Sequence, residues 1–216
     1  MSSDTTCLAV YLSPGTGTLP CMPSPLRQDD FDDLHEYIRV QVAAGYTSPS
    51  EIVDEAVEIF ADVASDAAGL RTAARAVTDR AISAHVAGQA DWPELTDCDR
   101  LDAAFAELDG SGIVARQHFS CCGTCGSHDI HGEVERARKA GTATRGFTFF
   151  HVQDTEHAVN GESLYLSYGS VSKDKLESVA IGHEVFDVLS RHGFAPTWNG
   201  KIAHRIGLPL RWQRRR

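Results

Sequence analysis

Apolar residues recur every three to four positions through the first half of the chain, which is the spacing of one helix face. The stretch 29–45 begins this pattern and predicts a first helix. Ser48 and Glu51 form a capping box with Pro49 between them, so a second helix is expected to begin there. Two later stretches with the same spacing predict a third and a fourth helix, over 70–88 and 97–109.

Beyond residue 110 the pattern changes to short apolar runs, which are typical of strands. Asn160-Gly161 is a strong turn signal and predicts a wide hairpin between two of these runs. The expected strands cover 113–119, 147–152 and 163–168, with two short ones near 196–198 and 206–210, and the expected helices cover 128–140 and 173–192. This order predicts an α+β fold, in which an N-terminal helical segment packs on a small mixed or antiparallel sheet with two further helices.

The distribution of proline and glycine sets the expected domain organisation. Residues 1–28 are rich in both and predict a disordered leader. We expect residues 29–216 to form a single α+β domain. It comprises a helical part over 29–110, a sheet part over 111–212 and a basic tail over 213–216.

Composition and charge narrow the classes of partner. Apolar residues make up 42% and charged residues 23%, as in ordinary globular proteins. The net charge of −10 argues against nucleic acid as a partner, because contacts to phosphate dominate that affinity. The first 110 residues hold 6 basic and 20 acidic side chains, and the other 106 hold 14 and 10. Opposite charges on the two halves favour attraction within one chain or between chains, which leaves a homo-oligomer open.

Short apolar runs also bear on location. None reaches the roughly 18 residues that a membrane-spanning helix needs, so no membrane partner is expected. No basic residue precedes the short apolar run at 8–12, so a secretion signal is not expected either. We therefore expect a cytoplasmic protein, in which cysteines serve as thiols, metal ligands or redox groups rather than as structural disulfides.

A cysteine cluster is the first candidate for chemistry. Cys121, Cys122 and Cys125 fall within five residues, and the last two form a C-x-x-C loop that suits a zinc ion. Glycines at 123 and 126 are expected to let backbone N–H groups turn toward the sulfur atoms. A tetrahedral zinc site needs further ligands, and histidines are the candidates, in particular His128 and His151, with His118 and His131 as others.

Two other interpretations of the cluster stay open. A strand followed by C-x-x-C and a helix is how thioredoxin-like proteins present a nucleophilic thiol, with Cys122 attacking and Cys125 or Cys121 resolving. The second of these interpretations is that small buried thiols pack in a tight turn.

A third hypothesis, besides a zinc-binding protein and a thiol-redox protein, is a non-enzymatic interaction module that docks through its acidic helical part. The sequence does not decide whether the protein is an enzyme.

A second candidate segment follows the apolar run at 147–152. His151, Asp154 and Glu156 are the candidate catalytic residues, since carboxylates can hold a histidine tautomer, act as a base or join a metal shell. The simpler interpretation is that Asp154 caps a turn and Glu156 is solvated. Placing strand 113–119 beside strand 147–152 would bring His151 near Cys122.

These motifs together resemble a known family. Its members carry a CCxxCG loop and an HxQDTE segment, which correspond here to Cys121–Gly126 and His151–Glu156, followed by Leu164–Gly169. The chain resembles this uncharacterised, mostly actinobacterial family over roughly residues 29–212. The resemblance implies that the cysteine loop and the histidine segment belong to one module, and it carries over no activity.

Overall fold

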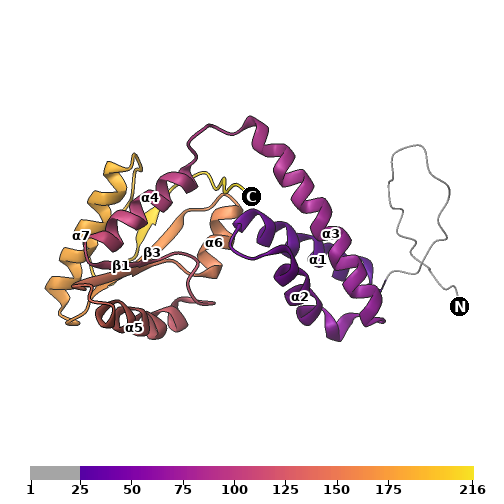
Figure 1. Ribbon diagram of the computed structural model, residues 1–216, viewed down its shortest axis with the longest axis horizontal. Helices are drawn as coiled ribbons and strands as arrows, with labels where there is room; N and C mark the ends of the chain where they lie inside the picture. Colours follow the sequence, from indigo (N-terminus) through magenta and orange to yellow (C-terminus); the bar gives the residue numbers. More distant parts are fainter. Residues whose placement is uncertain (1–24) are drawn as a thin grey trace, which may run out of the picture. The chain divides into compact units, whose positions relative to one another are not determined.

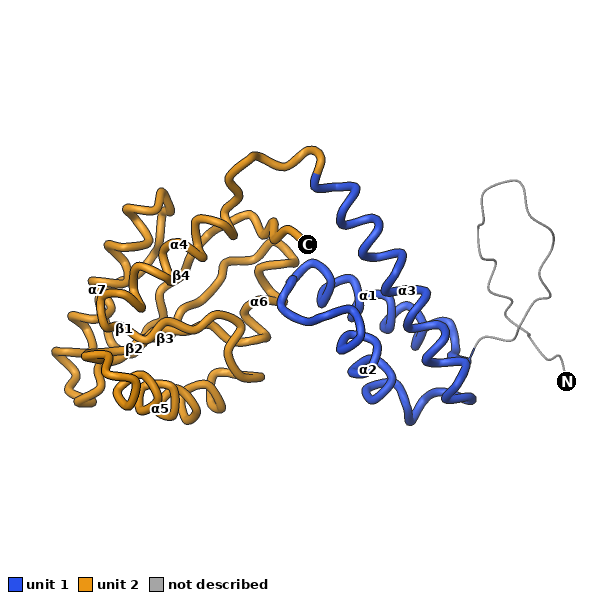
Figure 2. The backbone as a smooth tube through the Cα atoms, in the orientation of Figure 1, with its two compact units in different colours: residues 1–89 blue, residues 90–216 orange. Residues whose placement is uncertain are grey.

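The computed structural model describes residues 25–216, and their contacts divide them into two units (Figure 2). Unit 1 extends to Gln89, and unit 2 comprises Ala90–Arg216. The helical part predicted over 29–110 extends past this boundary, because helical periodicity alone does not indicate which core a helix joins.

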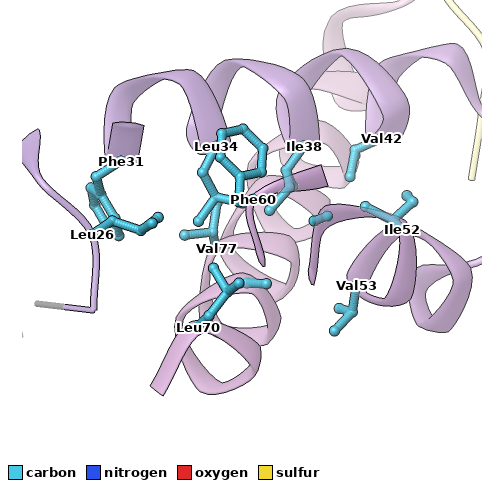
Figure 3. Packing of buried hydrophobic residues seen from close by; sticks show 12 residues of the cluster. Leu26, Phe31, Leu34, Ile38, Val42, Ile52, Val53, Phe60, Leu70 and Val77 are labelled. Carbon is cyan, nitrogen blue, oxygen red and sulfur yellow. The ribbon is translucent and has the colours of Figure 1, made fainter. Parts of the chain in front are cut away.

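Unit 1 is built from three helices around one apolar core (Figure 3). The predicted capping box is present, since Ser48 Oγ accepts from the backbone N–H of Glu51 and Glu51 Oε2 accepts from that of Ser48. The elements are α1 (Gln28–Ala44), α2 (Pro49–Ile59), the 3-10 turn η1 (Ala61–Val63) and α3 (Ala67–Gly88).

The end of the expected leader belongs to this core. Leu26 is 6% exposed and packs in the cluster with Phe31 and Leu34. Residues 25–28, which were expected to belong to a disordered leader, are therefore part of unit 1. Removing the apolar side chain of Leu26 from water stabilises this arrangement. Residues 1–24 of the expected leader lie outside the described part of the chain.

Unit 2 alternates helices and strands (Figure 1). A 3-10 turn, η2 (Gln89–Asp91), spans the boundary between the units. The elements that follow are α4 (Asp97–Gly110), β1 (Ile113–Arg116), α5 (Gly123–Lys139), β2 (Gly146–Phe149), α6 (Val152–Val159), β3 (Leu164–Ser170), α7 (Lys175–Arg191) and β4 (Ile206–Leu208).

The four strands form one mixed sheet in the order β1-β2-β3-β4. β1 and β2 are parallel neighbours, with Ala115 opposite Thr148, which is the arrangement that would bring His151 near Cys122. β2 pairs antiparallel with β3, and β3 antiparallel with β4. The α+β fold class is therefore confirmed.

Helices cover both faces of this sheet (Figure 1). Side chains alternate along β2, so Phe149 packs with Ile130 of α5 while Gly146 faces Ile181 of α7. A β-carbon at Gly146 would lie 2.6 Å from Ile181 Cδ1, so only glycine allows α7 to approach this closely. α4, predicted as the last helix of the helical part, packs on β1 and α7 instead.

The predicted hairpin between β2 and β3 is wrong in its connection. The two strands pair as expected, but helix α6 joins them. Asn160 is the C-cap of α6, and Gly161 follows it with a φ of +87°. Asn-Gly suits the left-handed backbone at a helix end as well as it suits a hairpin turn, and the helix wins here.

The basic tail lies on α4. Arg214 pairs with Asp102 at 2.8 Å, and Arg215 pairs with Asp99 at 2.9 Å. The opposite charges noted in the sequence therefore meet, in part, inside unit 2. Among the described residues, no helix is long and apolar enough to cross a membrane.

Candidate metal centre

The cysteine cluster lies where the loop after β1 enters α5. Backbone hydrogen bonds tie this loop to the end of β2, with Phe119 N donating to Phe150 O at 2.8 Å and Val152 N donating to Ser120 O at 3.1 Å. Ser120 has a φ of +61°, which is uncommon for a residue with a side chain. The loop therefore turns sharply just before Cys121, and these two backbone hydrogen bonds hold it against the chain that follows β2.

Three thiol groups converge at this turn. The Sγ atoms of Cys121, Cys122 and Cys125 all lie within 4.8 Å of one another, and none of the three forms a disulfide. Zinc–sulfur bonds of about 2.3 Å in a tetrahedron place sulfur atoms about 3.8 Å apart. The upper limit of 4.8 Å on the observed separations is about 1 Å longer than this distance.

Helix α5 begins inside the C-x-x-C motif rather than at residue 128. Cys122 is its N-cap in extended backbone, with φ −152° and ψ 172°. The backbone N–H of Cys125, the thiol of Cys125 and the backbone N–H of Thr124 lower the pKa of Cys122. Hydrogen bonds from Cys125 to the thiols of Cys121 and Cys122 raise the pKa of Cys125 to about 11. Cys122 is therefore the first of these two thiols to become a thiolate.

The two glycines of the motif have roles that the sequence analysis did not anticipate. A β-carbon at Gly126 would lie 2.5 Å from Cε2 of Phe149, and one at Gly123 would lie 3.5 Å from Nε2 of His151. Gly126 thus allows α5 to pack closely on β2, and Gly123 places the motif beside His151.

His128 lies on α5, three residues after Cys125. Its side chain is 90% exposed, and its Nδ1 lies 3.1 Å from Asp129 Oδ1. The opposite oxygen of Asp129 accepts from Ser120 Oγ at 2.7 Å. His128 is not part of the group within 4.8 Å, but residues three apart share a helix face, so rotation of the side chain can direct the imidazole toward Cys125.

His151 is the buried N-cap of α6. Its Nδ1 accepts from the backbone N–H of Asp154, and Asp154 Oδ2 accepts from the backbone N–H of His151 at 3.0 Å. The ring nitrogen Nε2 lies 3.1 Å from the same carboxylate. Burial lowers the pKa of His151 even though Asp154 opposes this effect. His151 is not part of the group of ligand atoms within 4.8 Å, although it lies against Gly123.

Asp154 is 3% exposed, and charged and polar groups surround its carboxylate. Both oxygens accept from the guanidinium of Arg205, 51 residues further along the chain, and one also accepts from the backbone of His151. Such a fully paired carboxylate favours a structural role over that of a base. Glu156, the third catalytic candidate, lies half-buried on α6.

Arg205 is the residue that the sequence analysis missed here. It follows a loop with no motif, and its guanidinium also donates to the backbone oxygen of Tyr165 on β3. Only the antiparallel pairing of β3 with β4 brings it to α6, so no local sequence signal identifies it.

His118, a further histidine considered as a ligand, is enclosed instead. Its Nδ1 lies 2.9 Å from Thr155 Oγ1. Burial, with a smaller effect of Arg214, lowers the pKa of His118 to about 4. His131 also turns away from the thiols, with its ring edge against Phe147.

The depressed pKa of His118 predicts an acid-sensitive contribution to stability. The unfolded chain, with a histidine pKa of about 6.5, binds this proton before the folded chain does, so stability present above pH 6.5 is lost as the pH falls toward 4. We expect His118→Gln to show about 1–2 kcal/mol less loss of unfolding free energy than the parent between pH 7 and pH 5, as measured by urea denaturation. Parallel pH profiles for the two proteins would contradict this assignment.

Comparison with known proteins adds a family. A family model described as "Domain of unknown function (DUF6891)" matches residues 27–216. No curated protein and no solved structure matches the chain.

Proposed function

The chain belongs to this family of domains of unknown function, and we propose that it binds zinc through the thiolates of Cys121, Cys122 and Cys125. The convergence of three sulfur atoms within 4.8 Å carries the proposal. Two of them have the C-x-x-C spacing of thiolates that share one ion, and the third, Cys121, follows directly after the turn at Ser120.

The charge balance of the loop supports metal binding. Three thiolates close together repel one another, and a divalent cation relieves that repulsion. Hydrogen bonds with the thiols of Cys121 and Cys122 raise the pKa of Cys125, so without an ion this thiol keeps its proton at neutral pH. A bound zinc ion would replace this proton, so affinity is expected to rise with pH.

The fourth ligand of the proposed zinc site decides whether the ion is structural or catalytic. His128 is the better protein candidate, because its side chain is exposed and lies near a single carboxylate, that of Asp129, among the described residues. His151 is the poorer candidate, because the capping box and Asp154 hold its ring. Ligation by His128 would close the site and make it structural, whereas water in its place would leave a catalytic position open.

Metal content tests this proposal. The full chain is purified without a histidine tag or chelator, zinc is counted per chain, and thiols are titrated before and after a chelator is added. We expect about one zinc per chain and three thiols that react only after chelation. Replacing any one of the three cysteines by serine should reduce zinc retention at least tenfold.

Cys98→Ala is the matched control. Cys98 is buried in α4, outside the cluster, and its pKa is raised to about 11 by burial. This variant should keep its zinc. Zinc retained by all three serine variants, or lost equally in the control, would refute the site.

A thiol–disulfide exchange protein is the second candidate. The C-x-x-C motif at the N-terminus of a 17-residue helix favours it, because Cys122 is half-buried rather than enclosed and its pKa is lowered there. The Cys122 thiolate would attack a substrate disulfide and release one thiolate, and Cys125 or Cys121 would then release the second as an internal disulfide forms. An absence of zinc together with a reversible disulfide among these residues would establish this function instead.

A cytoplasmic location, an actinobacterial origin and a homo-oligomer remain predictions, and the proposed site does not depend on them. If the protein holds no zinc and its thiols are inert, docking through the acidic helical part becomes the favoured hypothesis.

A further inference from the structure

A cavity of about 430 Å³ opens in unit 2, away from the cysteine loop. Its lining comes from the end of α5, the start of β2, the end of β3 and α7. Arg138, on its rim, lies 13 residues along α5 from Cys125, which is about 20 Å at 1.5 Å per residue. The cavity is thus separate from the proposed metal centre, and its volume suits a small molecule.

Three of the ten residues that line this cavity are aliphatic. Val171 follows β3, and Ala180 and Ile181 lie on successive positions of α7. These side chains can cover the apolar body of a ligand, but they cannot orient it. Orientation has to come from the seven polar and charged residues of the lining.

Most charges at the rim are already paired. Arg145 and Glu184 form two parallel hydrogen bonds of 2.7 Å. Glu177 accepts a hydrogen bond from Ser172 Oγ. One of the two arginines that line the cavity therefore remains without a carboxylate partner in the described part of the chain.

Arg138 is that arginine. Its Nε donates to Thr144 Oγ1 at 2.8 Å, and among the described residues no carboxylate lies within 4.0 Å of its guanidinium. Thr144 is 9% exposed, so a buried hydroxyl fixes the base of the arginine side chain. That contact uses Nε, so the two terminal Nη groups of Arg138 are left to donate two parallel hydrogen bonds to a carboxylate.

The neighbouring charges restrict the class of ligand. Glu177 lines the same cavity, so a ligand with two negative charges would meet repulsion. An aliphatic wall, one unpaired guanidinium and one nearby carboxylate together favour a single negative charge on an apolar body. We propose that this cavity binds a small aliphatic monocarboxylate, with its carboxylate on Arg138.

Hexanoate is the probe, and hexan-1-ol and 2-aminohexanoate are its comparators, titrated into the full ¹⁵N-labelled chain. We expect hexanoate to shift the amide signals of Val171, Ala180 and Ile181 in a saturable manner, and the alcohol to bind at least tenfold more weakly. Tighter binding of 2-aminohexanoate would identify Glu177 as the acceptor of an ammonium group and place amino acids in the ligand class.

The matched variants are Arg138→Gln and Arg136→Gln. Arg136 lies on the same helix, pairs with Glu133 and does not line the cavity. We expect the first variant to lose at least tenfold in affinity for hexanoate and the second to bind as the parent does. Ala180→Phe, which fills the cavity, should abolish binding.

Three results would overturn the proposal. They are an absence of saturable shifts up to the solubility limit, equal binding of hexanoate and hexan-1-ol, and equal binding by the parent and the Arg138→Gln variant. Amide spectra of each variant without ligand show whether the fold is retained, so a misfolded variant is not counted as a loss of binding.

Discussion

Asp154→Ala is expected to lower the free energy of unfolding of unit 2 by about 3 kcal/mol. The substitution removes both hydrogen bonds from Arg205 and one from the backbone of His151. The guanidinium of Arg205 and the backbone N–H of His151 then lose Asp154 as their acceptor. The loss is costly because Asp154 is only 3% exposed, so water does not readily replace it. Urea denaturation followed by circular dichroism measures the change.

A double-mutant cycle with Arg205→Ala separates this pair from its surroundings. We expect the double variant to be more stable than the sum of the single effects predicts, since each single variant leaves an unpaired charge. Glu184→Gln is the control, because Glu184 forms an exposed pair with Arg145 and should cost less than 1 kcal/mol. A loss below 1 kcal/mol for Asp154→Ala would show that the buried pair contributes no more than a surface pair.

Phe149→Ala is expected to destabilise unit 2 by about 3–5 kcal/mol, the usual cost of removing a fully buried aromatic ring. Phe149 contacts Phe119 edge to face, with the ring centres 5.8 Å apart, and lies against Gly126 at the start of α5. Its loss leaves a cavity directly beneath the helix that carries the cysteine loop. Leu176→Ala is the control, because Leu176 is 82% exposed and should cost less than 0.5 kcal/mol.

The contact with Gly126 supplies an independent check on this packing. Gly126→Ala should destabilise by about 1–3 kcal/mol, because its β-carbon would lie 2.5 Å from a ring that cannot move freely. The same substitution should cost less in the Phe149→Leu background, where that ring atom is gone. An unchanged or higher stability of Gly126→Ala in the parent would contradict the close packing of α5 on β2.

Local signals predicted most helices of this fold. The capping box at Ser48 and Glu51 starts α2, and the apolar spacing over 173–192 corresponds to α7 (Lys175–Arg191). Such signals lie within one or two helical turns of sequence, so they can be recognised without knowledge of the tertiary structure.

The errors arose where two local structures use the same residues. Asn160-Gly161 ends α6 instead of turning a hairpin, because His151 and Asp154 start a helix between β2 and β3. Histidine is not among the usual N-cap residues, so the capping box of α6 carried no familiar signature. The expected helix over 128–140 likewise begins earlier, at Gly123.

The candidate site was predictable only as far as its residues are close in sequence. The three cysteines fall within five positions, and the structure brings their sulfur atoms together. The environment of His151 depends on Arg205, which lies 51 residues from Asp154, and on the parallel pairing of β1 with β2. Contacts of that length leave no spacing pattern in one sequence.

X-ray absorption at the zinc edge tests whether the sulfur atoms of Cys121, Cys122 and Cys125 bind one zinc ion. The zinc-loaded full chain is predicted to show three sulfur neighbours at about 2.3 Å and one nitrogen or oxygen neighbour at about 2.0–2.1 Å. A shell made only of nitrogen and oxygen atoms, or one with fewer than three sulfur atoms, would contradict the proposed site.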